Sequence, residues 1–317
     1  MDTEEKGFSR TDRFESICKE IHDSWGKKDF LIQFTLTQFE WRKVRDMYME
    51  TYKEDILQLC QKIDSPFSSL MLNPFERDAD VAREALYHSD TVNYKALIEI
   101  FTCRKSSHVL LIIQAYLAKY RKHLDHEIVS IEPPHPYQKI LMAFSASHKA
   151  HYDDISQHIA KCDAKRLFQT GEGKLGAIDE AVVLEIFSKR SIAQLKLTFF
   201  FYKHIYGHSY TSFLKNGHFG EFEHTVRFVA KCISSPPKYY AKALYECLKG
   251  TTIDDGGLVR IIVSRSDVDM DEIEKLFEKK YGMELKNVIC EVIQEENHRD
   301  FLVALVNKVS TWKSASY

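Results

Sequence analysis

The sequence predicts an all-α protein built from four similar helical repeats. An aromatic pair with a spacing of four residues occurs four times, as Tyr48/Tyr52, Tyr116/Tyr120, Tyr202/Tyr206 and Phe277/Tyr281. Twelve residues before each pair is a reference position, an arginine in three of four cases: Leu36, Arg104, Arg190 and Arg265. The chain has only 12 glycines and 7 prolines in 317 residues, which argues against a turn-rich β architecture.

Apolar residues keep the same register around the reference positions. The residues at offsets −4, +5 and +20 are Ile32, Ile100, Ile186 and Ile261, then Trp41, Val109, Leu195 and Met270, then Ile56, Leu124, Tyr210 and Leu285. Intervals of 4, 5, 8 and 12 residues match one face of a helix rather than the alternation of a strand. The repeat is therefore predicted to be helical.

The elements of one repeat follow from this register. The dozen residues before the reference position predict one helix, those from about +3 to +14 predict another, and two shorter helices follow the aromatic pair. Acids such as Asp179 and Asp254 are expected at helix starts, where they complement the helix dipole. The arginines are expected to be partly buried and to donate to helix-end carbonyls, which Leu36 cannot do.

The spacing of the repeats predicts the domain organisation. Reference positions are 68, 86 and 75 residues apart, so a linker is expected at about 147–176, between repeats two and three. We expect a tail at 1–12, repeat one at 13–80, repeat two at 81–146, linker and repeat three at 147–236, repeat four at 237–312 and a tail at 313–317.

Composition limits the classes of function. The 44 Lys+Arg against 46 Asp+Glu give a net charge of −2, and no dense basic block occurs, so nucleic acid is not an expected partner. The N-terminal residues have no apolar run and no apolar window of about 20 residues exists, so neither a secretory signal nor a membrane helix is expected. Seven scattered cysteines indicate a reducing, cytoplasmic location.

Several motifs resemble the annexin family, specifically a plant-type annexin. They are Lys249-Gly-Thr-Thr-Ile-Asp-Asp255, Arg260-Ile-Ile-Val-Ser-Arg265, Tyr281-Gly282 and Asn73-Pro-Phe-Glu-Arg-Asp78, within a four-repeat match over about residues 13–312. The resemblance implies a curved all-α disk that binds calcium in loops on its convex face and, through calcium, anionic phospholipid. It also implies a peripheral membrane location for a cytoplasmic protein.

Calcium takes six to eight oxygen ligands, which a glycine-rich loop supplies from backbone carbonyls and a distant acid supplies from its carboxylate. In the family pattern the loop is Lys-Gly-x-Gly-Thr, with an acid about 42 residues after its first glycine. Here repeat four has Thr252 and Ile253 in the loop and Val292 at the acidic offset, and repeat three has Gly217 there. No repeat has the complete pattern, so calcium binding is expected to be weak.

Repeat four is the best remaining candidate for a calcium site. Carbonyls of Leu248, Gly250 and Thr252 could form its loop, with Glu291 or Glu295 as the acid. In repeat one, Trp25, Lys27 and Lys28 are candidates for direct contact with anionic headgroups, because a lysine near such a leaflet contributes about 1 kcal/mol and tryptophan favours the interface. The alternative is a solvated loop with a packed tryptophan.

Other features have weaker interpretations. The histidines His148, His151 and His158 fit one helix face but complete no metal ligand set, so surface histidines are expected. By resemblance, Cys103 and Cys232 form a redox-responsive pair, although burial as small apolar residues is the commoner role.

Two further motifs are judged not to be functional. Gly171-Glu-Gly-Lys-Leu-Gly176 lacks the ending and the preceding strand of a nucleotide loop. The segment Val259–Ile261 resembles a proposed actin-contact motif, but the repeat places it in a core helix.

No catalytic motif is found, so an enzyme is not expected. The alternative to membrane binding is an annexin-fold scaffold that binds proteins or itself without calcium.

Overall fold

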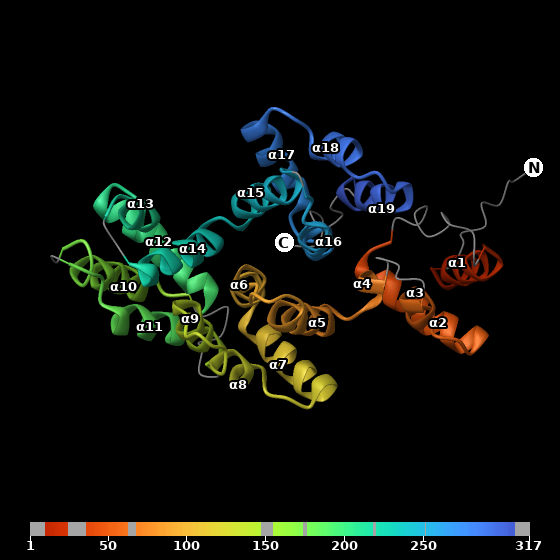
Figure 1. Ribbon diagram of the computed structural model, residues 1–317, viewed down its shortest axis with the longest axis horizontal. Coiled ribbons are helices and arrows are strands. Elements are labelled where there is room, and N and C mark those ends of the chain that lie inside the picture. The colour runs from red at the N-terminus through yellow and green to blue at the C-terminus, as the bar shows by residue number, and fades with distance from the viewer. Residues whose placement is uncertain are drawn as a thin grey trace, which may run out of the picture. The chain divides into compact units, whose positions relative to one another are not determined.

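The computed structural model describes residues 10–24, 36–62, 68–146, 155–173, 176–217, 220–250 and 252–307. Within these ranges every regular element is an α-helix, which confirms the predicted fold class (Figure 1). None of the described helices combines the length and the apolar character that crossing a bilayer requires.

The helices form four consecutive sets. Repeat one has α1 (Arg10–Ser24), α2 (Gln38–Tyr52), α3 (Ile56–Lys62) and α4 (Ser68–Met71). Repeat two has α5 (Pro74–Tyr87), α6 (Tyr94–Thr102), α7 (Ser106–Tyr120), α8 (Leu124–Val129) and α9 (Pro136–Ser145). Repeat three has α10 (Gln157–Gln169), α11 (Glu180–Lys189), α12 (Ile192–Tyr206), α13 (Tyr210–Asn216) and α14 (Glu221–Ser234). Repeat four has α15 (Pro236–Leu248), α16 (Asp255–Arg265), α17 (Met270–Tyr281), α18 (Leu285–Val292) and α19 (Glu296–Val306).

Repeats two to four thus contain five helices each, one more than the sequence pattern predicted. The additional helix opens the repeat, and in repeat three it is α10, which occupies much of the segment predicted as a linker. The linker prediction was wrong there because α10 precedes the register on which the repeat was defined. The fifth helix is also longer than expected, reaching 14 residues in α14. The predicted boundary at residue 80 falls inside α5.

The apolar register of the repeats is confirmed by burial. All described residues at offsets −4, +5 and +20 from the reference positions are buried. The first aromatic residue of each pair is also buried, whereas the second is half-buried and packs at the edge of the core. Tyr206 stacks on Phe168 of α10 and Tyr281 stacks on Tyr245 of α15, with ring centroids 3.9 and 3.8 Å apart. The aromatic pair therefore joins the third helix of a repeat to its first.

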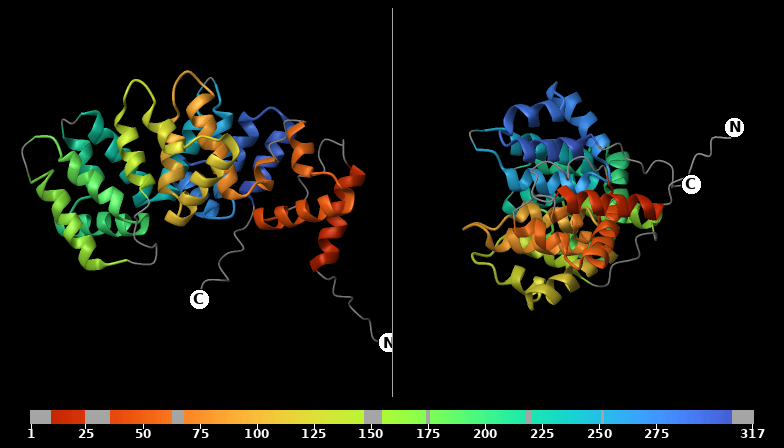
Figure 2. Two further views of the ribbon diagram at one scale, coloured as in Figure 1. Left: turned by 90° about the horizontal axis from the view of Figure 1, so that it is seen from below. Right: turned by 90° about the vertical axis from the view of Figure 1, so that its right-hand side faces the viewer.

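The described chain divides into two compact units. One contains residues up to Pro74 and from Tyr240 onward, and within it Gln38 of α2 donates from Nε2 to the carbonyl of Val263 in α16 at 2.7 Å. The other contains Phe75–Tyr239, where Phe144 of α9 stacks on Phe187 of α11 with ring centroids 5.2 Å apart. The side views in Figure 2 show again that each unit is built from helices alone in its described part.

The three reference arginines pair with carboxylates, which the prediction of helix-end carbonyls as their partners did not include. Arg104 and Arg190 each donate from Nε and Nη2 to an aspartate on the first helix of their repeat, Asp78 and Asp163. Arg265 donates in the same way to Asp269 at the start of α17. Asp78 and Asp163 lie outside the register used to define the repeat, whereas Asp269 is only four residues after its arginine. At the reference position of repeat one, the apolar side chain of Leu36 takes the place of the arginine and is 2% exposed.

Candidate functional site

The loop between the first and second helices has the same closure in repeats two, three and four. Its last residue caps the second helix through its side chain, and the backbone N–H of that residue donates to a carbonyl near the end of the first helix. The capping residues are Asn93, Asp179 and Asp254, and the accepting carbonyls belong to Ala85, Thr170 and Cys247 at 2.8, 2.9 and 3.1 Å. The expectation that Asp179 and Asp254 serve helix starts is therefore confirmed.

In repeat four this closure uses Asp254, the last residue of the loop. Oδ1 of Asp254 accepts from the N–H of Gly257 at 2.9 Å, and the Sγ of Cys247 lies 3.7 Å from Oδ2. A Cβ atom on Gly257 would come within 2.4 Å of that carboxylate, so the close approach requires glycine. Asp254 is therefore committed to the helix end.

The residues predicted as calcium ligands lie on separate parts of repeat four. Leu248 is buried at the end of α15, Gly250 has a left-handed φ of 129°, and Thr252 is exposed. Glu291 is exposed in α18, and Glu295 is the exposed residue before α19. No group of three or more histidine, cysteine or acidic residues that could hold a metal ion is found in the described part of the chain.

In repeats two, three and four, a residue in the first turn of the fifth helix contacts the end of the loop that leads into the second helix. This residue is 33 positions after the reference position of its repeat. In repeat three, Glu223 accepts from the N–H of Ile178 at 3.3 Å and from the N–H of Gly220 at 3.1 Å. In repeat four, Nε2 of His298 lies 3.0 Å from Oδ1 of Asp255.

Repeat two replaces this polar contact with an aromatic one. Tyr137 stacks on Tyr94, the first residue of α6, with ring centroids 5.1 Å apart and an interplanar angle of 18°. These contacts join the region where the second helix starts to the first turn of the fifth helix. We call them the loop braces: Tyr137–Tyr94, Glu223 with Ile178 and Gly220, and His298–Asp255.

A further acid of the repeat-three loop is also engaged by the protein. Oε2 of Glu172 accepts from the hydroxyl of Tyr202 at 2.8 Å and lies 2.8 Å from Nε2 of His208. Burial and the hydrogen bond to Glu172 raise the pKa of the Tyr202 hydroxyl, so it stays a neutral donor. Glu172 is thus tied to the third helix of its repeat.

Repeat two has a comparable acid on α8. Glu127 lies 3.1 Å from Nη1 of Arg83 and 2.7 Å from Nζ of Lys122, and it accepts from the hydroxyls of Tyr87 and Tyr116. Burial alone would raise the pKa of Glu127, but the hydrogen bonds from Lys122 and the two tyrosines outweigh it and lower the pKa to about 2. Its charge is neutralised within the repeat.

The remaining predicted residues are placed as follows. Trp25, Lys27, Lys28, His148 and His151 lie outside the described residues.

Cys103 follows α6 and is half-buried, whereas Cys232 is fully buried in α14. Burial, with the nearby Cys103, raises the pKa of the Cys232 thiol well above its usual value, which disfavours the reactive thiolate. In the segment resembling an actin motif, Ile261 is 1% exposed within α16.

Known proteins resemble this chain over most of its length. The sequence profile of the annexin family matches residues 162–227 and 239–305. Human annexin A3 is 34% identical over 243 residues, covering 76% of this chain and 74% of that protein, and mouse annexin A3 is 32% identical over 95% and 93%. Chicken annexin A6 is 28% identical over 90% of this chain, which spans only 43% of that longer protein.

Solved structures show the same fold. Annexin III superimposes with a TM-score of 0.81 at 26% identity, covering 96% of this chain and 95% of that one. A calcium-bound annexin (Sm)1 superimposes with a TM-score of 0.79 at 20% identity over 93% and 90%.

Proposed function

Because the chain belongs to the annexin family, we propose that it binds anionic phospholipid membranes peripherally, with weakened dependence on calcium. Calcium-dependent phospholipid binding is the activity of the family. The weakened dependence on calcium is inferred from the residues at the acidic positions and from the contacts of the loop acid Asp254. The acidic offset holds Gly217 in repeat three and Val292 in repeat four, and Asp254 is hydrogen-bonded within the protein.

Loss of the distant acid has a predictable effect on affinity. A bidentate carboxylate supplies two of the six to eight oxygens and one negative charge, and ligand charge is a main determinant of calcium affinity. Nearby acids are already engaged within the protein, since Glu223 accepts two backbone N–H groups and Glu172 accepts from Tyr202, so coordination of calcium would compete with these contacts. The remaining candidate is repeat four, with Leu248, Gly250 and Thr252 as carbonyl ligands and Glu291 or Glu295 as the acid.

Sedimentation with phosphatidylserine-containing vesicles, with and without calcium, tests this proposal. The double variant Glu291→Gln/Glu295→Gln should abolish the calcium-dependent part of binding. The charge-matched control, Glu15→Gln/Glu272→Gln, removes two exposed acids from the first halves of α1 and α17 and should leave binding unchanged. Wild-type binding as calcium-dependent as that of an annexin with complete sites, or tight calcium binding in repeat two or three, would overturn the proposal.

Calcium-independent binding is assigned to Lys27 and Lys28, with Trp25 at the interface. Replacement of both lysines with alanine should reduce it, and added salt should weaken it because exposed charges are screened beyond about 8 Å at physiological ionic strength. The control Lys19→Ala/Lys43→Ala removes the same charge from exposed positions of α1 and α2 and should have no effect. Equal losses in the two variants would exclude a specific role for Lys27 and Lys28.

The second candidate is a scaffold that binds proteins or a second copy of itself without calcium or lipid. It is favoured by the exposed apolar side chains of α7, where Leu110 and Leu111 are each 43% exposed. Absence of vesicle binding in both conditions, together with a concentration-dependent increase in sedimentation coefficient, would support it. Actin binding through Val259–Ile261 is not part of this proposal, because Ile261 is buried.

A further inference from the structure

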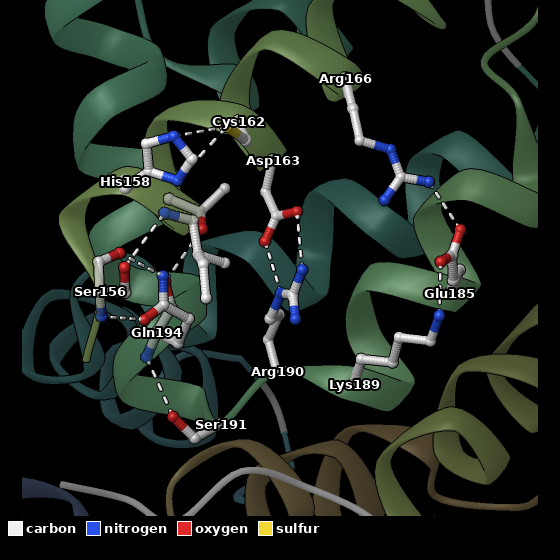
Figure 3. A network of polar contacts seen from close by, with 12 residues as sticks. Ser156, His158, Cys162, Asp163, Arg166, Glu185, Lys189, Arg190, Ser191 and Gln194 are labelled. Carbon is white, nitrogen blue, oxygen red and sulfur yellow. Dashed lines mark hydrogen bonds and ion pairs between the residues drawn. The ribbon is translucent and has the colours of Figure 1, made fainter. Parts of the chain in front are cut away.

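We propose that His158 and Cys162 form a two-ligand surface site for a thiophilic divalent cation of the zinc class. Both residues are exposed, and they lie one turn apart on the same face of α10. The Sγ of Cys162 lies 3.9 Å from Nδ1 and 3.9 Å from Nε2 of His158 (Figure 3). The proposal does not depend on calcium or lipid binding by the loops.

The spacing of the two ligands fits a tetrahedral ion. Zinc binds thiolate sulfur at about 2.3 Å and imidazole nitrogen at about 2.0–2.1 Å, so the sulfur and nitrogen around a tetrahedral zinc lie about 3.6 Å apart. The sulfur now lies 3.9 Å from both ring nitrogens, so it faces the part of the ring between them. Metal binding therefore requires the imidazole to rotate until one nitrogen points at the ion held by the sulfur. Both side chains are exposed, which leaves room for this rotation.

The backbone that carries the two ligands is held in place. Oγ of Ser156 caps α10 by accepting from the N–H of Ile159 at 3.3 Å. Ser156 also exchanges two hydrogen bonds with the side-chain amide of Gln194 in α12, at 2.8 and 2.9 Å (Figure 3). The turn containing His158 is therefore fixed before a metal binds, which reduces the ordering cost of binding.

The chemistry of the pair selects the type of metal. Thiolate and imidazole favour zinc and similar soft ions, whereas calcium prefers oxygen ligands. The carboxylates drawn nearby are engaged with cations, Asp163 with Arg190 and Glu185 with Arg166 and Lys189. In the described part of the chain no third histidine, cysteine or acid joins the pair. Water would complete the coordination, so the site should exchange its metal readily.

Cobalt substitution of the reduced, full-length chain tests the site, because a cobalt–thiolate bond gives a charge-transfer absorption band. Zinc affinity is measured in parallel by competition with a chromogenic chelator. We expect one equivalent of metal to produce the band, and we expect binding to strengthen as the pH rises, because the thiol must lose its proton. Cys162→Ser should abolish the band, and His158→Ala should weaken the affinity for zinc at least tenfold.

The control is Cys290→Ser, which removes the other exposed cysteine, on α18, and should leave the band and the affinity unchanged. Far-UV circular dichroism of each variant checks that the helices remain folded. Absence of a band in the wild type, loss of the band in Cys290→Ser, or wild-type zinc affinity in His158→Ala would each overturn the proposal. The last result would assign the imidazole ligand to another histidine.

Discussion

Replacing Arg190 with leucine should destabilise the protein more than any loss of packing explains. Arg190 donates two hydrogen bonds to Asp163, at 2.6 and 3.2 Å, and the Asp163 side chain is only 2% exposed (Figure 3). The variant leaves this carboxylate buried without its cation. Breaking a buried ion pair by removing one partner typically costs about 3–5 kcal/mol, and we expect a loss of that size in the free energy of unfolding.

The double variant Arg190→Leu/Asp163→Leu separates the charge from the shape. Replacing both members of a buried pair with apolar residues is often close to neutral, so the double variant should be within about 2 kcal/mol of the wild type. Repeat one supports this expectation, because buried Leu36 occupies the position of the arginine. Arg190→Lys should fall between the wild type and Arg190→Leu, because an ammonium keeps the charge but cannot form the two-pronged contact.

Urea and thermal unfolding, followed by far-UV circular dichroism, measure these differences. For a unit of this size, each 1 kcal/mol corresponds to about 2–4 °C in melting temperature, so Arg190→Leu should melt about 6–20 °C lower than the wild type. A double variant as unstable as Arg190→Leu would refute the argument, since the cost would then come from packing rather than from an unpaired carboxylate.

Two further predictions concern the acids of the repeats. In Glu127→Gln, the stability lost relative to the wild type should be at most about 3 kcal/mol at neutral pH and should shrink as the pH falls from about 4.5 to about 2, because the lowered pKa of Glu127 stabilises the fold only while the carboxylate is ionised; a difference that does not change with pH in urea titrations would contradict this. In Glu223→Gln, loss of a charge-assisted hydrogen bond to Ile178 or Gly220 should cost about 1.5–3 kcal/mol, and millimolar calcium should not restore the melting temperature. Full rescue by calcium would contradict the weak calcium binding expected of repeat three.

The core of the fold could be predicted from the sequence because its signal is periodic. The apolar residues around each reference position are buried as expected, including Trp41 at 1% exposure and Phe277 at 0%. The first helix of each repeat was missed because its aromatic residues, which stack on the third helix, do not stand at one fixed offset from the reference position. Phe168 and Tyr245 stack on the third helix from positions that differ by two residues relative to the arginine.

The contacts of the candidate site were less predictable. That the loop acids would cap helices could be read from their place before an apolar run, as for Asp254. That Glu223 would reach Ile178, or that His298 would face Asp255, depends on how separate helices pack and leaves no local pattern. His158 and Cys162 did leave a local pattern, because the two residues are four positions apart. The pattern was not used, because His158 was expected to be a surface histidine.

The loop braces offer a physical reason why repeats lacking a calcium acid could keep their loops closed. A calcium ion that joins two loops stabilises them only when it is bound, whereas the hydrogen bonds of Glu223 and the ring stack of Tyr137 contribute at every calcium concentration. The three braces start from the same structural position, yet they use a phenol, a carboxylate and an imidazole. The shared requirement is therefore a contact across the loops rather than a particular side chain. In repeat three, coordination of calcium by Glu223 would compete with its two backbone hydrogen bonds, and this competition adds to the weakness expected from the missing acid.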